Sequence, residues 1–337
     1  MLDLDARRPV GTTQLLLGPL GLGVAPLGNL YAKVSETDAQ AALAEAQRHQ
    51  ISWFDVAPKY GFGLAEARLG HFLEKASRRP IISTKVGRLL EPAEKETAHG
   101  EFVEPLPYRE VFDYSHEGIE RSYADSLRRL GTDRIEILLL HDVDRLNHPS
   151  GHRVLVKQLL EEALPMLKKM KDERRVDAVG LGVCEWDIGF EILVSADLDC
   201  VLLAGRYTLF DTSACASGFL DACARRHVSV LAGGVFNSGF LAGGSQYDYH
   251  AADTSLLERR NRLRAICKQY EVPLAGAALQ FTAAHPSITS IVIGARNAEE
   301  VDAILDWSRT PIPEALWVAL RKAQFIPEDA PTPVGSA

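Results

Sequence analysis

The feature that most constrains this chain of 337 residues is a regular alternation of short apolar runs with amphipathic segments. The apolar runs are continuous and rich in Val, Ile and Leu, as expected of strands that are buried on both faces. Eight such runs occur, at residues 23–28, 52–57, 80–86, 135–141, 178–183, 200–205, 229–234 and 290–294. Strands that alternate with helices predict a parallel sheet, which closes as a barrel or stays open as a doubly wound fold. Eight repeats without a second composition zone favour the closed (β/α)8 TIM barrel.

Segments with helical spacing lie between the runs. They cover residues 39–50, 64–75, 116–130, 155–172, 187–196, 213–227 and 298–307, with an additional pair at 255–270 and 274–285. Ser35 and the acidic Asp38 predict a cap at the start of the first helix. We expect one domain over residues 1–337, with a small cap at 15–22 before the first strand and a frayed tail at 327–337.

Composition excludes several classes of partner. The chain has 37 Lys and Arg against 45 Asp and Glu, a net charge of −8, which argues against nucleic acid and anionic membranes. No apolar run approaches the roughly 18–20 residues that span a bilayer, and residues 1–10 lack the apolar core of a signal peptide, so we expect a cytoplasmic protein. The five cysteines show no CxxC spacing, so we expect neither a disulfide framework nor a metal site. A small-molecule substrate is the expected partner, and the oligomeric state stays open.

Two connections are too long for plain turns between a strand and a helix. One covers residues 87–115 and the other covers residues 236–253. Both follow strands, and in a barrel such loops lie on the catalytic face. They are either covers for a substrate or cofactor, which long loops in compact domains often are, or surface decoration.

Polar residues stand at the ends of successive predicted strands. Asp55, Lys85 and His141 end the second, third and fourth runs, and Tyr60 follows in the loop after Asp55. These ends meet at one mouth of a barrel, and a buried ammonium is costly unless it is paired. We therefore expect Asp55 and Lys85 to neutralise each other, either as a structural ion pair or as part of a catalytic site. In the catalytic interpretation Lys85 lets the Tyr60 phenol ionise more easily than at its ordinary pKa of about 10. Tyr60 then exchanges a proton and His141 orients the reacting oxygen.

The sequence resembles the aldo-keto reductase family over roughly residues 12–310. The similarity is carried, in order, by GNL at 28–30, FDVAPKYG at 54–61, EARLG at 66–70, STKVG at 83–87, SLRRLG at 126–131, LH at 140–141 and IGAR at 293–296. The resemblance implies a (β/α)8 barrel that binds a nicotinamide dinucleotide without a GxGxxG motif. Pro26 indeed stands where the third glycine of such a motif would be. It also implies that Tyr60 is the general acid/base, that Lys85 and Asp55 tune it, and that His141 positions the substrate oxygen.

The same resemblance assigns the cofactor to the loops after the seventh and eighth strands, at residues 234–241 and 294–300. The residues expected at the cofactor are Gly28, Asn29, Leu30, Asp55, Cys184, Arg206, Gly234, Val235, Phe236, Asn237, Gly239, Leu241, Ile293, Gly294, Ala295, Arg296, Glu299 and Glu300. Relatives that prefer NADP place basic residues in the second loop. Here Glu299, Glu300 and Asp302 crowd it and Arg296 is its only base, so we expect NAD, with NADP as the alternative if Arg296 stacks on adenine.

Three positions depart from the family pattern. Cys184 stands where a serine of a Ser-Asn pair is common, Ala204 where a glutamine is common, and Gly233 where an aromatic residue often stacks on the nicotinamide. Cys184 is then a small wall residue or a redox-sensitive thiol. Arg206 forms an ion pair at a strand end or contacts the substrate or cofactor, and the sequence favours neither.

Within the family, the sequence is similar to sugar and vitamin dehydrogenases of the D-threo-aldose 1-dehydrogenase (L-fucose or L-galactose dehydrogenase) and pyridoxal 4-dehydrogenase types. The resemblance implies oxidation of the cyclic hemiacetal of an aldose to its lactone. Oxidation of pyridoxal to 4-pyridoxolactone and general aldehyde or ketone reduction are the alternatives. A cofactor-sensing binding subunit is a further alternative, against which the four intact polar residues argue. A hydrolase barrel would need paired carboxylates or a metal cluster, and the sequence shows neither.

Overall fold

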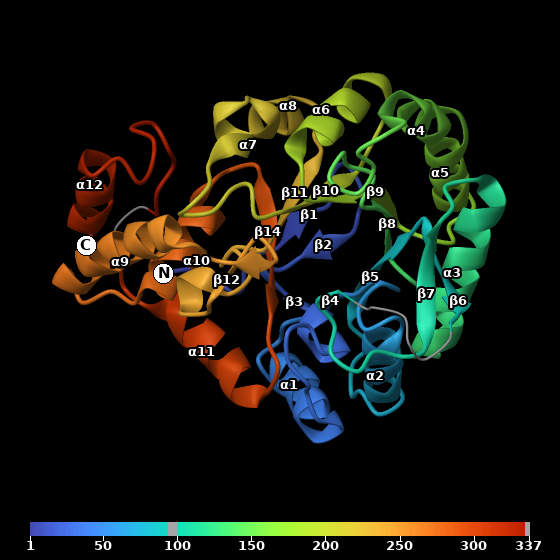
Figure 1. Cartoon of the computed structure of the whole chain (residues 1–337), viewed down its shortest axis with the longest axis horizontal. Helices are drawn as coiled ribbons and strands as arrows, with labels where there is room; N and C mark the ends of the chain where they lie inside the picture. Colours follow the sequence, from blue (N-terminus) through green and yellow to red (C-terminus); the bar gives the residue numbers. More distant parts are fainter. Residues whose placement is uncertain (94–99, 334–337) are drawn as a thin grey trace.

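The computed structural model describes residues 1–93 and 100–333, and these form a closed barrel of parallel strands surrounded by helices (Figure 1). In chain order the barrel strands are β3 (Leu20–Gly23), β4 (Trp53–Asp55), β5 (Ile81–Val86), β8 (Ile137–His141), β9 (Ala178–Val183), β10 (Cys200–Ala204), β11 (Ser229–Gly233) and β14 (Ile288–Gly294). Each strand pairs with its neighbours in this order, and β14 returns to pair with β3. The expected (β/α)8 barrel is confirmed.

Helices cover the outside of the barrel. They are α1 (Glu36–Arg48), α2 (Leu64–Leu73), α3 (His116–Leu130), α4 (His152–Gln158), α5 (Leu164–Asp172), α6 (Trp186–Ser195), α7 (Ser213–Ala216), α8 (Phe219–Arg225), α9 (Thr254–Gln269), α10 (Leu274–Ala284), α11 (Ala298–Arg309) and α12 (Glu314–Lys322). A π-helical turn, Leu159–Ala163, joins α4 to α5. The Ser35 hydroxyl oxygen accepts a 3.0 Å hydrogen bond from the backbone N–H of Asp38, so it caps α1 as the sequence predicts. Among the described residues, no helix combines the length and the apolar character that crossing a membrane requires.

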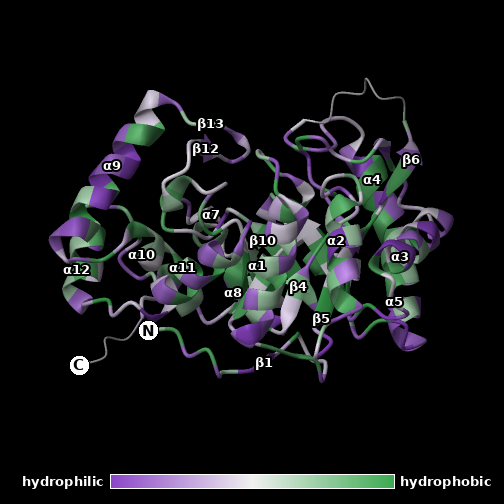
Figure 2. Cartoon of the chain, turned by 90° about the horizontal axis from the view of Figure 1, so that it is seen from below, coloured by the Kyte–Doolittle hydropathy of each residue, from purple (hydrophilic) through white to green (hydrophobic). Residues whose placement is uncertain are grey.

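Apolar side chains form two layers, one inside the barrel and one between the strands and the helices. The inner layer contains Trp53, Ile137, Leu139, Ala178, Cys200, Leu202, Leu231 and Val292. A short hairpin of β1 (Arg8–Pro9) and β2 (Leu16–Leu17) adds Val10 and Leu17 to this layer. Figure 2 shows β1 at the opposite side of the molecule from β12 and β13. The hairpin therefore closes one end of the barrel and leaves the other end for the site.

The first barrel strand lies earlier than predicted, at Leu20–Gly23 instead of residues 23–28. Pro26 stands inside the predicted strand and has no backbone N–H to donate to a neighbouring strand. Residues Ala25–Gly28 form a 3-10 helix instead, which ends at Asn29 in a left-handed conformation (φ 67°). The segment expected to cap the barrel thus supplies part of its first strand, and the β1–β2 hairpin supplies the cap.

Two further expectations need correction. The predicted helix over residues 213–227 is split into α7 and α8 by Gly218, whose positive φ of 78° interrupts the helical backbone. In the predicted tail, Ala330 is buried and its carbonyl oxygen accepts a 2.9 Å hydrogen bond from Arg321 Nη2. This part of the tail packs against α12 instead of fraying. Residues 334–337 lie outside the described residues.

Both long connections contain hairpins. The first holds β6 (Arg88–Pro92) and β7 (Tyr108–Phe112), although residues 94–99 between them lie outside the described residues. The second holds a 3-10 turn, Phe240–Ala242, followed by β12 (Gln246–Tyr247) and β13 (His250–Ala251). Both begin directly after barrel strands, β5 and β11, so they stand at the carboxyl ends of the strands.

Candidate active site

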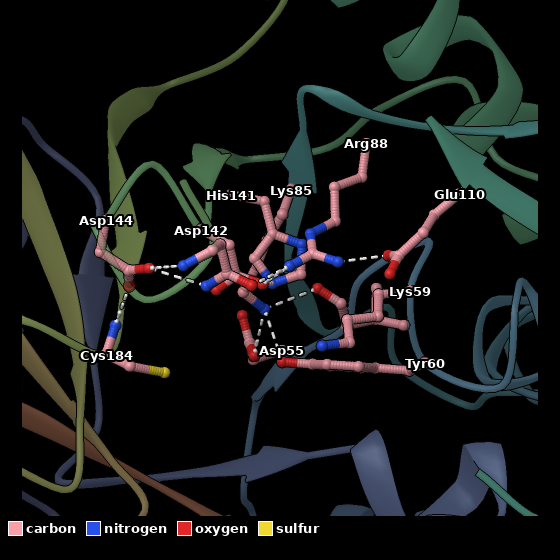
Figure 3. A network of polar contacts seen from close by, with 12 residues as sticks. Asp55, Lys59, Tyr60, Lys85, Arg88, Glu110, His141, Asp142, Asp144 and Cys184 are labelled. Carbon is pink, nitrogen blue, oxygen red and sulfur yellow. Dashed lines mark hydrogen bonds and ion pairs between the residues drawn. The ribbon is translucent and has the colours of Figure 1, made fainter. Parts of the chain in front are cut away.

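Three polar side chains meet at the carboxyl ends of neighbouring strands (Figure 3). Asp55 is the last residue of β4, Lys85 is near the end of β5, and Tyr60 lies in the turn after β4. Lys85 Nζ donates hydrogen bonds to Asp55 Oδ2 (2.8 Å), to the Val56 carbonyl oxygen (2.9 Å) and to the Tyr60 hydroxyl oxygen (3.1 Å). All three protons of the ammonium are therefore engaged, which compensates for burying a charge that is only 2% exposed.

A second chain of hydrogen bonds fixes the Asp55 carboxylate. Trp53 Nε1 donates to Ser83 Oγ (3.0 Å), and Ser83 Oγ donates to Asp55 Oδ1 (2.7 Å). Asp55 and Ser83 stand opposite each other in the parallel pairing of β4 and β5. One carboxylate oxygen thus binds a hydroxyl and the other binds the ammonium, so the carboxylate cannot rotate without losing a bond.

The protonation of Tyr60 follows from burial and from its charged neighbours. Burial is the largest influence and raises the pKa, Lys85 lowers it and Asp55 raises it, so that the pKa of Tyr60 is raised to about 12. Burial also lowers the pKa of Lys85, but Asp55 and Tyr60 outweigh burial and raise that pKa. Lys85 thus lowers the pKa of Tyr60, as the sequence predicts, but burial outweighs this effect, so the phenol does not ionise more easily than an ordinary one. The site holds a neutral phenol beside a charged ammonium.

His141 brings an imidazole to the same place. It ends β8, and its ring meets the ring of Tyr60 edge-on, with the centroids 6.2 Å apart. Its Nε2 lies 3.4 Å from Asp142 Oδ2. Burial, followed by the positive charges of Arg88 and Lys85, lowers the pKa of His141 well below its ordinary value. The imidazole is therefore neutral and can hydrogen-bond an uncharged oxygen next to Tyr60. We call Asp55, Tyr60, Lys85 and His141 together the Tyr60 site.

A buried guanidinium that the sequence reasoning missed adjoins His141. Arg88, the first residue of β6, forms ion pairs with Asp142 and Glu110 and donates a 2.8 Å hydrogen bond to Asn147 Oδ1 (Figure 3). Arg88 is 2% exposed, so these partners replace the hydrogen bonds that water would otherwise make to the guanidinium. The sequence offers no signal for this cluster, because its members come from three separate segments.

Three potential metal ligands, Asp142, Asp144 and Cys184, lie within 4.8 Å of one another. Asp144 accepts hydrogen bonds from the backbone N–H of Cys184 (2.9 Å) and from Asn147 Nδ2 (2.7 Å), while Asp142 pairs with Arg88. Both carboxylates are thus engaged with protein partners. Burial, followed by the charges of Asp142 and Asp144, raises the pKa of the Cys184 thiol. A protonated thiol argues against the redox-sensitive interpretation.

The Tyr60 site opens into a cavity of about 570 Å³, a size typical of small-molecule sites. Asp55 and Tyr60 line this cavity, and so do Arg296 and Glu300 from the loop after β14. The cavity therefore joins the Tyr60 site to the start of α11.

The structure divides the residues expected at the cofactor into two sets. Those that line the cavity are Leu30, Asp55, Gly234, Val235, Phe236, Gly239, Ile293, Gly294, Arg296 and Glu300. Those that do not are Gly28, Asn29, Cys184, Arg206, Asn237, Leu241, Ala295 and Glu299. Lining residues that the sequence reasoning did not name include Ser245, Gln246, Tyr249, Ala303 and Trp307. The long connection at 236–253 was the signal for the first three of these, and α11 carries the other two.

Two residues outside the lining hold the neighbouring turns in place. Asn29 Oδ1 accepts hydrogen bonds from the backbone N–H of Val34 (3.0 Å) and from Arg68 Nη1 (3.1 Å). Gly28 packs against the backbone of Tyr60 so closely that a Cβ atom would lie 2.6 Å from the Tyr60 carbonyl carbon. Only glycine allows this approach, so Gly28 helps to position the turn that carries Tyr60.

Arg206 joins three loops by hydrogen bonds and ion pairs. Its Nε donates to the Cys184 carbonyl oxygen (2.8 Å), and its Nη1 contacts Asp211 Oδ2 (3.1 Å) and Asp248 Oδ2 (2.6 Å). Burial lowers the pKa of Arg206, but the two carboxylates outweigh burial and raise it. Of the two interpretations left open by the sequence, the structure favours the strand-end ion pair.

Arg296 is also paired. Its Nε donates a 2.8 Å hydrogen bond to Glu300 Oε1, and its backbone N–H donates to Glu300 Oε2 (2.8 Å). Asn297 Oδ1 in turn accepts from the backbone N–H of Glu300 (2.9 Å), which caps α11. Glu300 therefore neutralises Arg296 at the start of this helix, and Glu299 beside it is exposed.

Comparison with known proteins agrees with this geometry. Residues 19–324 match the Aldo/keto reductase family. The chain is 41% identical to a pyridoxal 4-dehydrogenase from Microbacterium luteolum, over 96% of this chain and 99% of the relative. It is 36% identical to a D-threo-aldose 1-dehydrogenase from a Pseudomonas species, over 93% of this chain and 96% of the relative.

Solved structures share the fold at lower identity. An aldo-keto reductase from Bacillus halodurans in its holo form matches with a TM-score of 0.73 at 22% identity, over 94% of this chain and 95% of that one. A glycerol dehydrogenase from Gluconobacter oxydans matches with a TM-score of 0.74 at 17% identity, over 98% of both chains. The barrel and the two sequence relatives together show that this chain is an enzyme that belongs to the aldo/keto reductase family.

Proposed function

We propose that this enzyme is an NAD-dependent dehydrogenase that oxidises a cyclic hemiacetal, of an aldose or of pyridoxal, to its lactone. The two sequence relatives are named for pyridoxal and for D-threo-aldoses. Both kinds of substrate carry a hydroxyl that closes onto the aldehyde, so both present the same reacting group, a carbon bearing one hydrogen and one hydroxyl. A single arrangement of proton acceptor and hydride acceptor therefore serves either substrate.

The observation that carries the proposal is the position of Lys85 between Asp55 and Tyr60, which both line the cavity. Tyr60 accepts the proton of the anomeric hydroxyl, while the hydrogen on the anomeric carbon leaves with its electron pair. Lys85 stabilises the phenolate form of Tyr60, since an ammonium favours a neighbouring negative charge. The neutral His141 donates a hydrogen bond to the substrate oxygen as its carbonyl forms.

The cavity suits a dinucleotide that supplies the hydride acceptor when bound. It runs from the Tyr60 site to the start of α11, and the N-terminus of a helix favours a negatively charged group such as a pyrophosphate. Gly233, Gly234, Gly239 and Gly244 line it without side chains, and a Cβ atom added at Gly239 would meet no atom within 4 Å. We assign the nicotinamide end to the side of Asp55 and the adenosine end to Arg296 and Glu300.

The charges at the adenosine end support NAD over NADP. Arg296 is the one cationic side chain in the cavity lining, within the parts of the chain that the structure describes. Its charge is already neutralised by Glu300, with a second carboxylate at Glu299 beside it. A 2′-phosphate would meet net negative charge there, whereas a ribose hydroxyl can donate to a carboxylate.

The test is to measure initial rates of NADH formation by the purified enzyme with L-fucose and with pyridoxal. We expect turnover of at least one of them with NAD, and lactone as the product. Turnover of L-fucose alone would assign an aldose 1-dehydrogenase, and turnover of pyridoxal alone a pyridoxal 4-dehydrogenase. If neither is oxidised while NAD binds tightly, the proposal is wrong, and reduction of aldehydes and ketones with NADH should be tested instead.

A further inference from the structure

The hairpin of β12 and β13 ends in an unusual turn. Asp248 and Tyr249 occupy its two central positions, with φ of 45° and 68°. A two-residue hairpin turn with positive φ at both positions ordinarily carries Asn-Gly or Asp-Gly, because a side chain at the second position is strained. Tyrosine at this position therefore has a conformational cost that the surrounding structure must offset.

Side chains of neighbouring loops hold the turn in this conformation. Asp248 Oδ2 accepts a 2.6 Å hydrogen bond from Arg206 Nη1, and Asp248 Oδ1 accepts one from Asn237 Nδ2 (3.2 Å). The backbone N–H of Tyr249 donates to Ser238 Oγ (2.9 Å). Arg206 is itself fixed by Asp211 and by the Cys184 carbonyl oxygen, as described above. The turn is thus tied to the loops that follow β9, β10 and β11.

These ties direct the Tyr249 phenol toward the Tyr60 site. Tyr249, Tyr31 and Tyr60 all line the same cavity, although 45% of the Tyr249 residue surface faces solvent. The pKa of Tyr249 is raised well above its ordinary value, first by Cys184, next by burial, and then by Tyr60, Asp142 and Tyr31. Tyr249 therefore contributes to the wall of the cavity that also contains Tyr60 and Tyr31.

A second tyrosine of the cavity lining, Tyr31, lies in the loop between β3 and α1. It too has a positive φ, 62°, and its backbone N–H donates a 2.8 Å hydrogen bond to the Glu101 carbonyl oxygen. Burial is the largest influence and raises the pKa of Tyr31, Ser238 lowers it, and Glu101, Asp248 and Cys184 raise it. Two tyrosines in strained backbone conformations are therefore presented to one cavity.

We propose that Tyr249 contacts the substrate ring and determines which hemiacetals the enzyme accepts. The proposal rests on the function proposed above, since it places the substrate between Tyr60 and the β12–β13 hairpin. The ring of Tyr249 offers an apolar face to a pyranose or pyridine ring, and its hydroxyl offers one donor and one acceptor to the ring substituents. The hydrogen bonds that hold the turn restrict the conformations of this segment, which reduces the entropy lost on binding.

The experiment compares Tyr249→Ala and Tyr249→Phe with the wild-type enzyme, using L-fucose and pyridoxal. We measure kcat and KM for both substrates, and the dissociation constant of NAD by protein fluorescence. His250→Ala is the matched control, because His250 is the next residue of the hairpin, is exposed and does not line the cavity.

We expect Tyr249→Ala to raise the KM of the oxidised substrate roughly tenfold or more, to change kcat much less, and to leave NAD binding and the His250→Ala enzyme near wild type. Tyr249→Phe separates the hydroxyl from the ring and should change the ratio of the two KM values. An unchanged KM in Tyr249→Ala overturns the proposal, and so does a KM that rises only in step with the NAD dissociation constant. If the wild-type enzyme oxidises neither substrate, the proposed function fails first and this inference falls with it.

Discussion

The Lys85 ammonium lies 2.8 Å from an Asp55 carboxylate oxygen, in a part of the barrel where neither side chain is more than 4% exposed. The same nitrogen lies 3.1 Å from the Tyr60 hydroxyl oxygen. One buried positive charge is therefore shared between a permanent anion and a tyrosine whose phenolate form accepts the proton in the proposed oxidation. This arrangement links the stability of the barrel mouth to the chemistry proposed for it.

Removing the ammonium alone should destabilise the protein. Lys85→Met leaves the Asp55 carboxylate buried without its partner, which typically lowers the free energy of unfolding by about 3–5 kcal/mol. The double variant Asp55→Asn/Lys85→Met removes both charges and should recover most of that loss. Denaturant unfolding of the two variants measures the difference. A double variant less stable than Lys85→Met would contradict the pairing, and both variants should lack turnover.

The pH dependence of oxidation should reflect the raised pKa of Tyr60. A base with a pKa of about 12 is almost fully protonated near neutral pH, so the phenolate fraction grows as pH increases. We expect kcat/KM for oxidation to rise with pH beyond the ordinary phenol value of about 10. Because burial keeps His141 neutral, we expect no inflection in the pH profile near the ordinary histidine pKa of about 6.5. A plateau that begins well below pH 10 would show that another group accepts the proton.

The sequence predicts the Tyr60 site because of a general property of barrels. Asp55, Lys85 and His141 each end a continuous apolar run, and the carboxyl ends of parallel strands meet at one mouth. The direction of the pKa shift of Tyr60 could not be predicted from the sequence. The sign of the Tyr60 shift depends on burial outweighing Lys85, and burial is a property of the packed molecule.

Contacts between loops could not be predicted either. Arg88 pairs with Glu110 and Asp142, and the sequence gives no reason to choose these acids among 45. For Arg206 the sequence left an ion pair and a contact to substrate or cofactor open, and it is Asp248 that binds Arg206, from a hairpin whose turn conformation is unusual for its residues. Pro26 argues against a strand at residues 23–28 as well as against a dinucleotide motif, because proline has no backbone N–H to donate.

The preference for NAD over NADP should weaken when Arg296 loses its ion pair with Glu300. Glu300→Gln removes the charge that neutralises Arg296 and leaves the guanidinium free to bind a 2′-phosphate. We expect the ratio of kcat/KM with NADP to kcat/KM with NAD to rise about tenfold or more, since hydrogen bonds between charged groups are among the strongest. Glu299→Gln is the control, because it removes an equal charge from the adjacent residue. Equal effects of the two variants would show that only net charge matters.

The contribution of the Arg206 ion pairs to the β12–β13 hairpin can be measured separately from that of Tyr249. Arg206→Met removes the ion pairs to Asp211 and Asp248 and leaves Tyr249 in place. We expect faster cleavage of residues 244–252 by limited proteolysis of the NAD-free enzyme, because a loosened hairpin exposes its backbone more often. We also expect a higher substrate KM. Wild-type cleavage and KM in this variant would show that the hairpin keeps its conformation without Arg206.

The most direct test of the proposed chemistry is Tyr60→Phe, assayed for NADH formation and for NAD binding in the same preparation. Phenylalanine keeps the ring and removes the hydroxyl that Lys85 contacts. On our account the rate with the oxidised hemiacetal falls by at least about 100-fold, the lower range for loss of a general base, while NAD binds as in the wild-type enzyme. Turnover near the wild-type rate would contradict the account, because Tyr60 would then not accept the proton.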